Sequence, residues 1–261
     1  MERKLITLLT DFGTKDPYAG IMKGVIFGIN PDAQVIDLSH GIPRQDLLAA
    51  ALVLWASVPY FPRGTIHVAV VDPEVGTKRR ALLLQAEGSY FIGPDNGILS
   101  LAVAGKKTEK IVDLTNEVFH LGPKSRTFHG RDIFAPVAAY LSLGIPPGDF
   151  GPAAQDFVRL PWPEVIKGER AIEGEVIYID SFGNLVTNIQ RRDLESLEIE
   201  RLRITLGEVT ICGVARNYAA GASPFVALIN SWDLLEISVF KGSAQLERRA
   251  KIGDRVRVEV S

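Results

Sequence analysis

The sequence predicts an α/β protein with two domains: an N-terminal three-layer α/β domain with a mostly parallel sheet, and a C-terminal antiparallel β-barrel domain. Strands and helices alternate through residues 1–150, a segment with three prolines and little periodicity follows at 151–170, and short strands without a long helix fill residues 171–261. Alternating strands and helices are typical of a parallel sheet covered on both faces, whereas an uninterrupted series of short strands favours a barrel or a sandwich. The segment at 151–170 is predicted to be a linker.

Period and length place the elements of the first domain in order. The strand KLITLLTD leads through a loop into a helix over IMKGVIFGIN, and VIDLSH forms a second strand before an apolar helix from Asp46 to about Tyr60. TIHVAVVDP is continuous in β-branched residues, as expected for a strand covered on both faces. ALLLQAEG and SYFIGPDNG are predicted to pair, KIVDL is another strand, and RDIFAPVAAYLSLG is a helix in which Pro136 lies early enough to be tolerated.

The second domain is predicted from short stretches of alternating polar and apolar residues. They are EGEVIYID, NLVTNI, RLRITLGEVTICG, PFVALIN, LLEISVF and DRVRVEV. Because no long helical pattern interrupts them, we expect a small antiparallel barrel or sandwich.

The net charge, the cysteine content and the length of the apolar stretches exclude several classes of protein. A net charge of −2 gives no electrostatic footprint for nucleic acid. The single cysteine, Cys212, excludes an internal disulfide framework and a multi-cysteine metal site. The longest uncharged stretch, residues 47–62, is too short to span a bilayer, and Asp11 interrupts the apolar start before a signal-peptide core forms. We expect a cytoplasmic protein with neither nucleic acid nor membrane as a partner.

Acidic residues follow two of the predicted parallel strands. Asp11 ends the first strand and Asp72 ends the third, while His129 lies just before the last helix of the domain. Because ligands of parallel α/β domains bind beyond the carboxyl ends of the strands, these three residues are candidates for one site. Each acid taken singly is more typical of a turn or a helix cap.

Arg79 lies seven residues beyond Asp72, across a turn that contains Gly76. Spacing alone favours a solvent-exposed loop for the basic run 78–80. A hairpin-like return would instead bring the Arg79 guanidinium beside Asp72, where a permanently protonated arginine can orient a polar reactant. His129 could add general acid/base catalysis, since the ordinary pKa of histidine is about 6.5.

The other histidines give little support to a metal site. His40, His67 and His120 lie apart in the sequence, without the i, i+4 pair of a zinc-binding helix. Asp11 and Asp72 with His129 could still hold a hard cation, and this alternative stays open.

Two turns carry further polar residues. PDNG, with Asp95 and Asn96, is a strong turn signal and favours a structural role. In IDSFGNLVTNI, Asp180 and Asn184 flank a turn that could be only a hairpin. The same two side chains could instead offer an acceptor and an amide to a heterocycle.

Six stretches carry a resemblance that spans both domains in order. They are TDFGTKDPYAG, VVDPEVGTKRR, FIGPDNG, TFHGRD, DSFGNLVTNI and INSWDLLEI. Together they resemble the S-adenosyl-L-methionine (SAM) hydroxide adenosyltransferases, which are SAM hydrolases related to fluorinases and chlorinases. The resemblance implies that water or hydroxide attacks the 5′-carbon of SAM and releases adenosine and L-methionine, without metal or cofactor. It implies a catalytic trio of Asp72, Arg79 and His129, with His129 weakly favoured as the proton acceptor.

The resemblance also implies a homotrimer, in which the substrate lies between the α/β domain of one subunit and the barrel of its neighbour. Trp232 is expected to be a packed aromatic residue. The expected substrate contacts are the ribose hydroxyls for Asp11, the sugar or base for Phe128, the methionine amino group for Asp180, the adenine edge for Asn184, and the rest of the pocket for Ser231, Glu236 and the backbone around Val239.

Three alternatives accompany this prediction. A SAM-dependent halogenase is disfavoured, because the halogenase pattern has tyrosine where this chain has His129, and fluorinases have serine where Gly130 stands. A non-catalytic adenosine- or SAM-binding protein could keep Asp11 and Asn184 while losing the trio, which is present here. A metal-dependent hydrolase would lose its activity in chelator.

Overall fold

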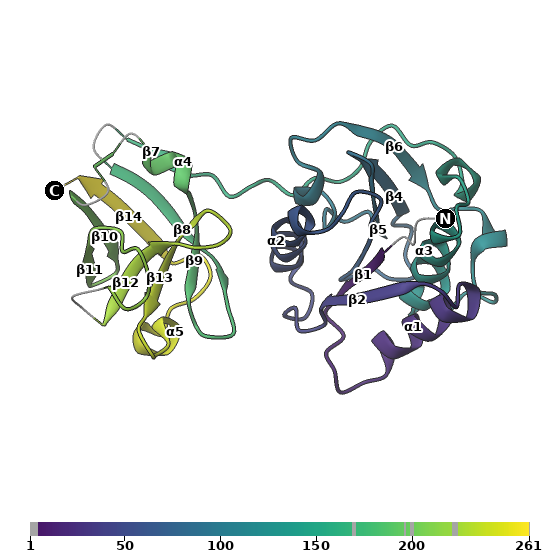
Figure 1. The fold of residues 1–261 in the computed structure, drawn as a ribbon, viewed down its shortest axis with the longest axis horizontal. Helices are drawn as coiled ribbons and strands as arrows, with labels where there is room; N and C mark the ends of the chain where they lie inside the picture. The colour runs from purple at the N-terminus through teal and green to yellow at the C-terminus, as the bar shows by residue number, and fades with distance from the viewer. Residues whose placement is uncertain (1–4, 169–170, 196, 199–200, 221–223, 261) are drawn as a thin grey trace. The chain divides into compact units, whose positions relative to one another are not determined.

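The computed structural model describes residues 5–168, 171–195, 197–198, 201–220 and 224–260. The chain divides into two compact units, with the boundary between Leu160 and Pro161. Both units are drawn in Figure 1. None of the helices in the described residues is both long enough and apolar enough to cross a membrane.

The first unit is built on a six-stranded sheet of order β2-β1-β3-β5-β4-β6. Parallel pairing joins β1 to β2, β1 to β3 and β3 to β5, whereas β4 runs antiparallel to β5 and to β6. The sheet is thus mostly parallel, as predicted. The strands are β1 (Leu5–Thr10), β2 (Gln34–Ser39), β3 (Ile66–Val70), β4 (Ala81–Ala86), β5 (Ser89–Pro94) and β6 (Thr108–Asp113).

Helices cover both faces of this sheet, which gives the three predicted layers (Figure 1). The helices are α1 (Tyr18–Ile29), α2 (Leu47–Ser57) and α3 (Ala135–Ser142). One face of β1 and β3 packs with α1 and α3 in a core that includes Ile6, Met22, Ile26, Val68 and Val137. All five residues of β3 are buried, because the strand is covered on both faces.

Two helices begin next to candidate site residues. Asp46 caps α2 by accepting a hydrogen bond from the main-chain N–H of Ala49 at 2.9 Å. Ahead of α3, residues Gly130–Phe134 form a single π-helical turn that begins directly after His129. Pro136 lies in the first turn of α3, directly after the π-helical turn. It has no N–H to donate to the Asp132 carbonyl four residues earlier, and that carbonyl accepts instead from the N–H of Leu121 at 2.8 Å.

The second unit is an antiparallel, nearly closed barrel-like sheet of order β11-β10-β14-β8-β9-β13-β12, to which β7 adds by pairing with β8. Its interior is filled by aliphatic side chains such as Val176, Ile189, Ile204 and Val258. The strands are β7 (Ile166–Lys167), β8 (Ala171–Ile179), β9 (Leu185–Gln190), β10 (Leu202–Leu206), β11 (Val209–Cys212), β12 (Phe225–Ile229), β13 (Leu234–Val239) and β14 (Arg255–Val260), with short helices α4 (Arg191–Leu194) and α5 (Ala244–Arg248).

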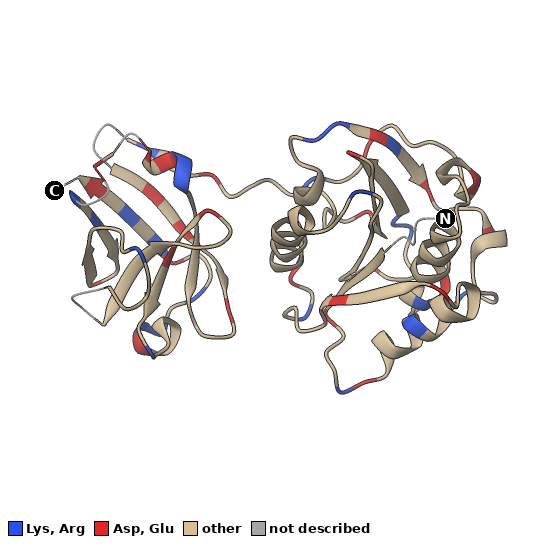
Figure 2. Cartoon of the chain, in the orientation of Figure 1, with Lys and Arg blue, Asp and Glu red and all other residues tan. Residues whose placement is uncertain are grey.

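The stretch RLRITLGEVTICG is a hairpin, not one strand. β10 and β11 pair around Gly207, whose φ of +56° lies in the left-handed region. On the outer face of this sheet, charges of both signs lie side by side on β8 and β14 (Figure 2). Arg257, for example, donates to Glu173 at 2.6 Å.

Residues 152–160 belong to the first unit and are hydrogen-bonded to its other residues. The N–H of Asp113 donates to the Pro152 carbonyl at 2.9 Å, and the N–H of Val158 donates to the Asp95 carboxylate at 2.7 Å. At the other end of the stretch 151–170, β7 pairs with β8 of the barrel. The unpaired connection between the units is therefore shorter than that stretch.

Candidate active site

A cavity of about 130 Å³ lies in the first unit, beyond the carboxyl ends of β1 and β3. Asp11 follows β1, and Asp72 lies two residues beyond the end of β3. The loop before the π-helical turn supplies Phe128 and His129 to the same cavity. Parallel strands expose their ends at one edge of a sheet, and this explains why residues far apart in sequence meet here.

Asp72, Arg79 and His129 form one hydrogen-bonded trio. Arg79 Nε donates to Asp72 Oδ1 at 2.9 Å, and Arg79 Nη2 donates to Asp72 Oδ2, so the contact is bidentate. Arg79 Nη2 also contacts His129 Nδ1 at 2.8 Å. The side chains of Arg79 and Asp72 are only 4% and 6% exposed. Lys78 is exposed, as its spacing favoured, whereas the Arg79 side chain turns inward from the same loop.

The contact with Arg79 defines the tautomer of His129. A guanidinium carries only donors, so Nδ1 must accept and the imidazole proton lies on Nε2. Burial lowers the pKa of His129, and the Arg79 cation lowers it further. The neutral ring therefore presents an N–H donor at Nε2.

Close backbone approach brings the Arg79 turn to the His129 loop. Gly76 has a φ of +80°, and a Cβ at this position would overlap the carbonyl oxygen of Arg126. The loop is fixed from its other side by Asp132, a fully buried carboxylate that accepts from the N–H of Ser125 at 2.7 Å. Only glycine fits at position 76 without moving the two loops apart.

Asp11 and Phe128 line the same cavity. Asp11 Oδ2 accepts from the N–H of Gln45 at 3.0 Å, and Gln45 has a φ of +63°, which is uncommon outside glycine. The ring of Phe128 packs edge-on against Phe12 and Tyr18, with ring centroids 5.8 and 5.2 Å apart. The cavity thus has one acidic wall and one aromatic wall.

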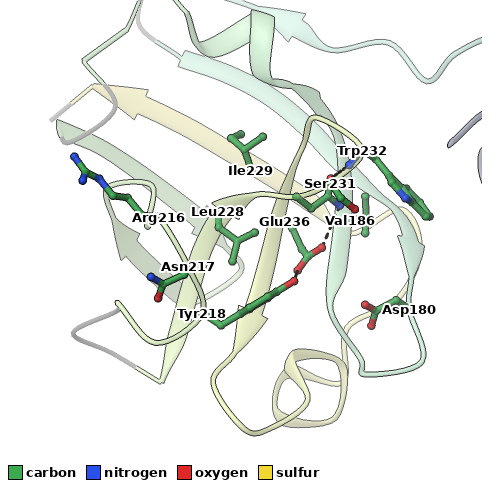
Figure 3. A pocket seen from close by; sticks show the side chains of 11 residues that line it. Asp180, Val186, Arg216, Asn217, Tyr218, Leu228, Ile229, Ser231, Trp232 and Glu236 are labelled. Carbon is green, nitrogen blue, oxygen red and sulfur yellow. Dashed lines mark hydrogen bonds between the residues drawn. The ribbon is translucent and has the colours of Figure 1, made fainter. Parts of the chain in front are cut away.

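The second unit holds a cavity of about 400 Å³ with partly polar walls (Figure 3). Asp180, Ser231 and Glu236 line it, together with Trp232, which also packs against Tyr178 with ring centroids 5.3 Å apart. The buried Glu236 carboxylate accepts hydrogen bonds from the Tyr218 hydroxyl at 3.0 Å, Ser238 Oγ at 2.7 Å and Asn230 Nδ2 at 3.1 Å. Arg216 extends away from Glu236 (Figure 3).

A second cavity in this unit, also about 400 Å³, has more apolar walls. It is lined by Asn184 and Val239 with the rings of Phe182 and Phe240. Asn184 Nδ2 donates to Asp180 Oδ2 at 2.9 Å, so a hydrogen bond links the two cavities. All five residues predicted for the barrel half of the site therefore lie around these two cavities, although not in one.

Two residues at the cavities, Tyr218 and Gln45, were not predicted from the sequence as site residues. Tyr218 lines both cavities of the barrel, and its pKa is raised to about 12 by burial and the nearby Glu236, so the hydroxyl remains a donor. It belongs to an irregular loop without periodicity, and nothing in the sequence singled it out. Gln45 contacts Asp11 through its main-chain N–H. Any residue other than proline could make this contact, so the residue type does not indicate it.

Other polar residues have structural roles. Asp95 accepts from Arg80 Nε at 2.8 Å, and Asn96 Nδ2 donates to the Val71 carbonyl at 2.8 Å, in keeping with the turn predicted at PDNG. His67 is a buried strand residue that contacts Thr7 Oγ1 at 2.9 Å. Within the described residues, no three His, Cys, Asp or Glu side chains come together as a metal-binding group.

Comparison with known proteins gives matches along the chain. Residues 6–151 match the family described as SAM hydroxide adenosyltransferase N-terminal domain, and residues 174–257 match its C-terminal domain. A Thermus thermophilus protein named (R)-S-adenosyl-L-methionine hydrolase is 37% identical over 97% of this chain and 98% of its own. A Salinispora arenicola protein of the same name is 44% identical over 74% of each chain.

The chain is also similar to a more distant named protein and to a solved structure. A fluorinase from an Actinoplanes species is 29% identical over 78% of this chain and 79% of its own. The crystal structure of an uncharacterized conserved protein from Thermotoga maritima superposes with a TM-score of 0.91 at 33% identity, covering 97% of this chain and 99% of that one.

Proposed function

Because the chain belongs to the SAM hydroxide adenosyltransferase family, we propose that it hydrolyses SAM to adenosine and L-methionine. The relatives named (R)-S-adenosyl-L-methionine hydrolase support the R configuration at sulfur as the substrate form. The observation that carries the proposal is the hydrogen-bonded trio of Asp72, Arg79 and His129, of which Asp72 and His129 line one cavity with Asp11.

The chemistry needs a positioned nucleophile more than an acid. As a water oxygen bonds to the 5′-carbon, the C–S bond breaks and its electron pair returns to sulfur, so methionine leaves as a neutral thioether. No group has to protonate the leaving sulfur. The enzyme must hold one water in line with the C–S bond and shield it from bulk solvent.

The trio can perform this task with its own groups. Arg79 holds Asp72 and His129 in fixed positions, and the Nε2–H of His129 donates to the water oxygen. We assign the water proton to Asp72 because the Nδ1 lone pair of His129 already accepts from Arg79. A carboxylate is a weak base, but an oxygen that has just bonded to carbon is strongly acidic, so a weak base suffices.

Binding roles divide between the two units. In the first unit, Asp11 accepts from the ribose hydroxyls and Phe128 packs against the sugar or base. In the barrel, the polar cavity takes the amino-acid part, with Asp180 on its amino group and Ser231 and Glu236 completing the wall. The more apolar cavity takes adenine, with Asn184 on its edge and the backbone around Val239 behind it.

We further propose a cytoplasmic homotrimer whose sites each join the first unit of one chain to the barrel of its neighbour. Co-expression of His129→Ala and Asp180→Ala chains tests this arrangement. In a symmetric ring with random mixing, about a quarter of the sites would combine two intact halves, and activity should return to that extent. If both halves of a site belong to one chain, the mixture stays inactive.

The activity itself is tested by incubating the purified chain with each sulfonium epimer of SAM in chloride buffer, with and without EDTA. Chromatography and mass spectrometry should detect adenosine and methionine in equal amounts, undiminished by EDTA. A 5′-chloro-adenosine product would establish a halogenase instead. Binding without turnover of either epimer would establish a non-catalytic binding protein, and loss of activity in EDTA would establish a metal-dependent hydrolase.

A further inference from the structure

Two buried threonine–histidine pairs lie in the sheet of the first unit. Thr7 Oγ1 and His67 Nδ1 are 2.9 Å apart in the middle of β1 and β3, whose residues are in register there. Thr10 Oγ1 and His40 Nδ1 are 2.8 Å apart, just beyond the carboxyl end of β2. The second pair adjoins the candidate site, because Thr10 directly precedes Asp11.

The His40 pair belongs to a cluster of polar side chains. His40 Nε2 lies 3.1 Å from Asp37 Oδ1, and Lys23 Nζ donates to Asp37 Oδ2 at 2.6 Å. Within the described residues Nε2 makes no hydrogen bond, so the contact of Nδ1 with Thr10 Oγ1 is the side-chain hydrogen bond that holds His40. The Thr10 oxygen then accepts from the N–H of Phe12 at 3.2 Å.

The main chain of His40 holds the same loop. The N–H of Gly13 donates to the His40 carbonyl at 2.7 Å. The side chain and the carbonyl of one residue therefore fix positions 10, 12 and 13, which surround Asp11. Asp11 itself contacts Gln45 and not His40, so any effect of His40 on Asp11 passes through the loop.

We propose that His40 is a positioning residue for ribose recognition, which holds the loop 10–13 so that the Asp11 carboxylate meets the ribose hydroxyls. This inference rests on the proposed function through the role of Asp11. His67 provides a matched control, since it makes the same contact in the same sheet but lies away from the loop.

The test measures the dissociation constants of adenosine and 2′-deoxyadenosine by calorimetry with the 261-residue chain. In the wild type, loss of a hydroxyl that donates to a carboxylate should weaken binding about 10- to 100-fold. Asp11→Ala should remove most of this discrimination. His40→Ala should reduce it to about 3-fold, and His40→Asn, whose amide can still hydrogen-bond with the Thr10 hydroxyl as donor or acceptor, should retain an intermediate value. His67→Gln should leave the wild-type ratio unchanged.

A general loss of stability would weaken both ligands alike and leave the ratio at its wild-type value. An unchanged ratio in the folded His40 variants would therefore overturn the inference, and so would an equal fall in His67→Gln. If His40→Ala does not fold, the ratio of the two dissociation constants in His40→Asn tests the inference in the same way. The proposed function fails separately, since absence of SAM turnover with an intact, His40-dependent ratio would disprove hydrolysis and not the positioning role.

Discussion

His129 can be tested for its role as a donor or as a base by two substitutions. In the structure, Nδ1 accepts from Arg79 and the proton lies on Nε2, so the ring is prepared to donate to the nucleophilic water. His129→Ala removes this donor, and the loss of one oriented donor costs about 10²- to 10³-fold in kcat. His129→Gln places an amide N–H near the position of Nε2, so it keeps most of this donor and we expect it to lose only about tenfold in kcat.

The measurement is steady-state kinetics of adenosine release for both variants and the wild type, with adenosine binding as the control. KM and the adenosine dissociation constant should change little, because the trio acts on water and not on the adenosyl group. If His129 were the general base, glutamine would be as inactive as alanine, since neither side chain can take a proton at neutral pH. Equal kcat values for the two variants would therefore refute the donor role.

The pH dependence of kcat follows from the same contact. Burial and the Arg79 cation lower the pKa of His129, so the ring stays neutral at pH values somewhat below the ordinary 6.5. Protonation at lower pH places a cation against Arg79 and removes the Nδ1 acceptor. We expect kcat to stay level as pH falls from 8 to about 6.5 and to decrease only below that value. A decrease that begins near pH 7.5 would contradict this assignment.

Three other substitutions test the structure around the site. Gly76→Ala should separate the Arg79 turn from the Arg126 carbonyl and cost about 100-fold in kcat with little change in adenosine affinity, and an active variant would show that this approach is not needed. Burial lowers the pKa of His67 from 6.5 to about 4, so its neutral form is favoured in the folded state. Its contribution to stability is fully present above pH 6.5 and falls by about 3 kcal/mol as pH decreases to 4; urea unfolding of His67→Gln should lack this component. Tyr218→Phe removes a donor to Glu236 and should lower the free energy of unfolding by about 1 kcal/mol, while unchanged urea midpoints would show that the bond contributes nothing.

Periodicity accounts for most of the fold. The β-branched run in TIHVAVVDP predicted a strand buried on both faces, and all of β3 is buried. Where the prediction differs from the structure, local conformation decides the outcome. RLRITLGEVTICG alternates as one strand would, but Gly207 adopts a φ of +56° and turns the chain into a hairpin. Glycine permits that conformation without requiring it, so the residue type alone did not reveal the turn.

The site was predictable only in part, for similar reasons. Asp11 and Asp72 lie at strand ends, and the parallel topology alone brings strand ends together. The contact between Arg79 and Asp72 depends instead on a turn whose path is fixed by Gly76 and the Arg126 carbonyl, which are 50 residues apart in the sequence. The position of the Tyr218 side chain at the cavities depends on its hydrogen bond to the buried Glu236. No pattern in the loop that contains Tyr218 predicts that contact. Tertiary packing, and not local sequence, decides these positions.

The burial of the Arg79–Asp72 pair explains why His129 is the better residue on which to test the mechanism. Removing ions from water is unfavourable, and a buried ion pair is weak evidence for stability on its own. Its function in this fold is to hold the guanidinium so that Nη2 points at His129 Nδ1. Substitution of Asp72 leaves a buried arginine without its carboxylate, so lost activity would mix misfolding with lost chemistry. Substitution of His129 leaves the ion pair intact, so under the proposed function its effect on kcat reports on the positioning of the nucleophilic water.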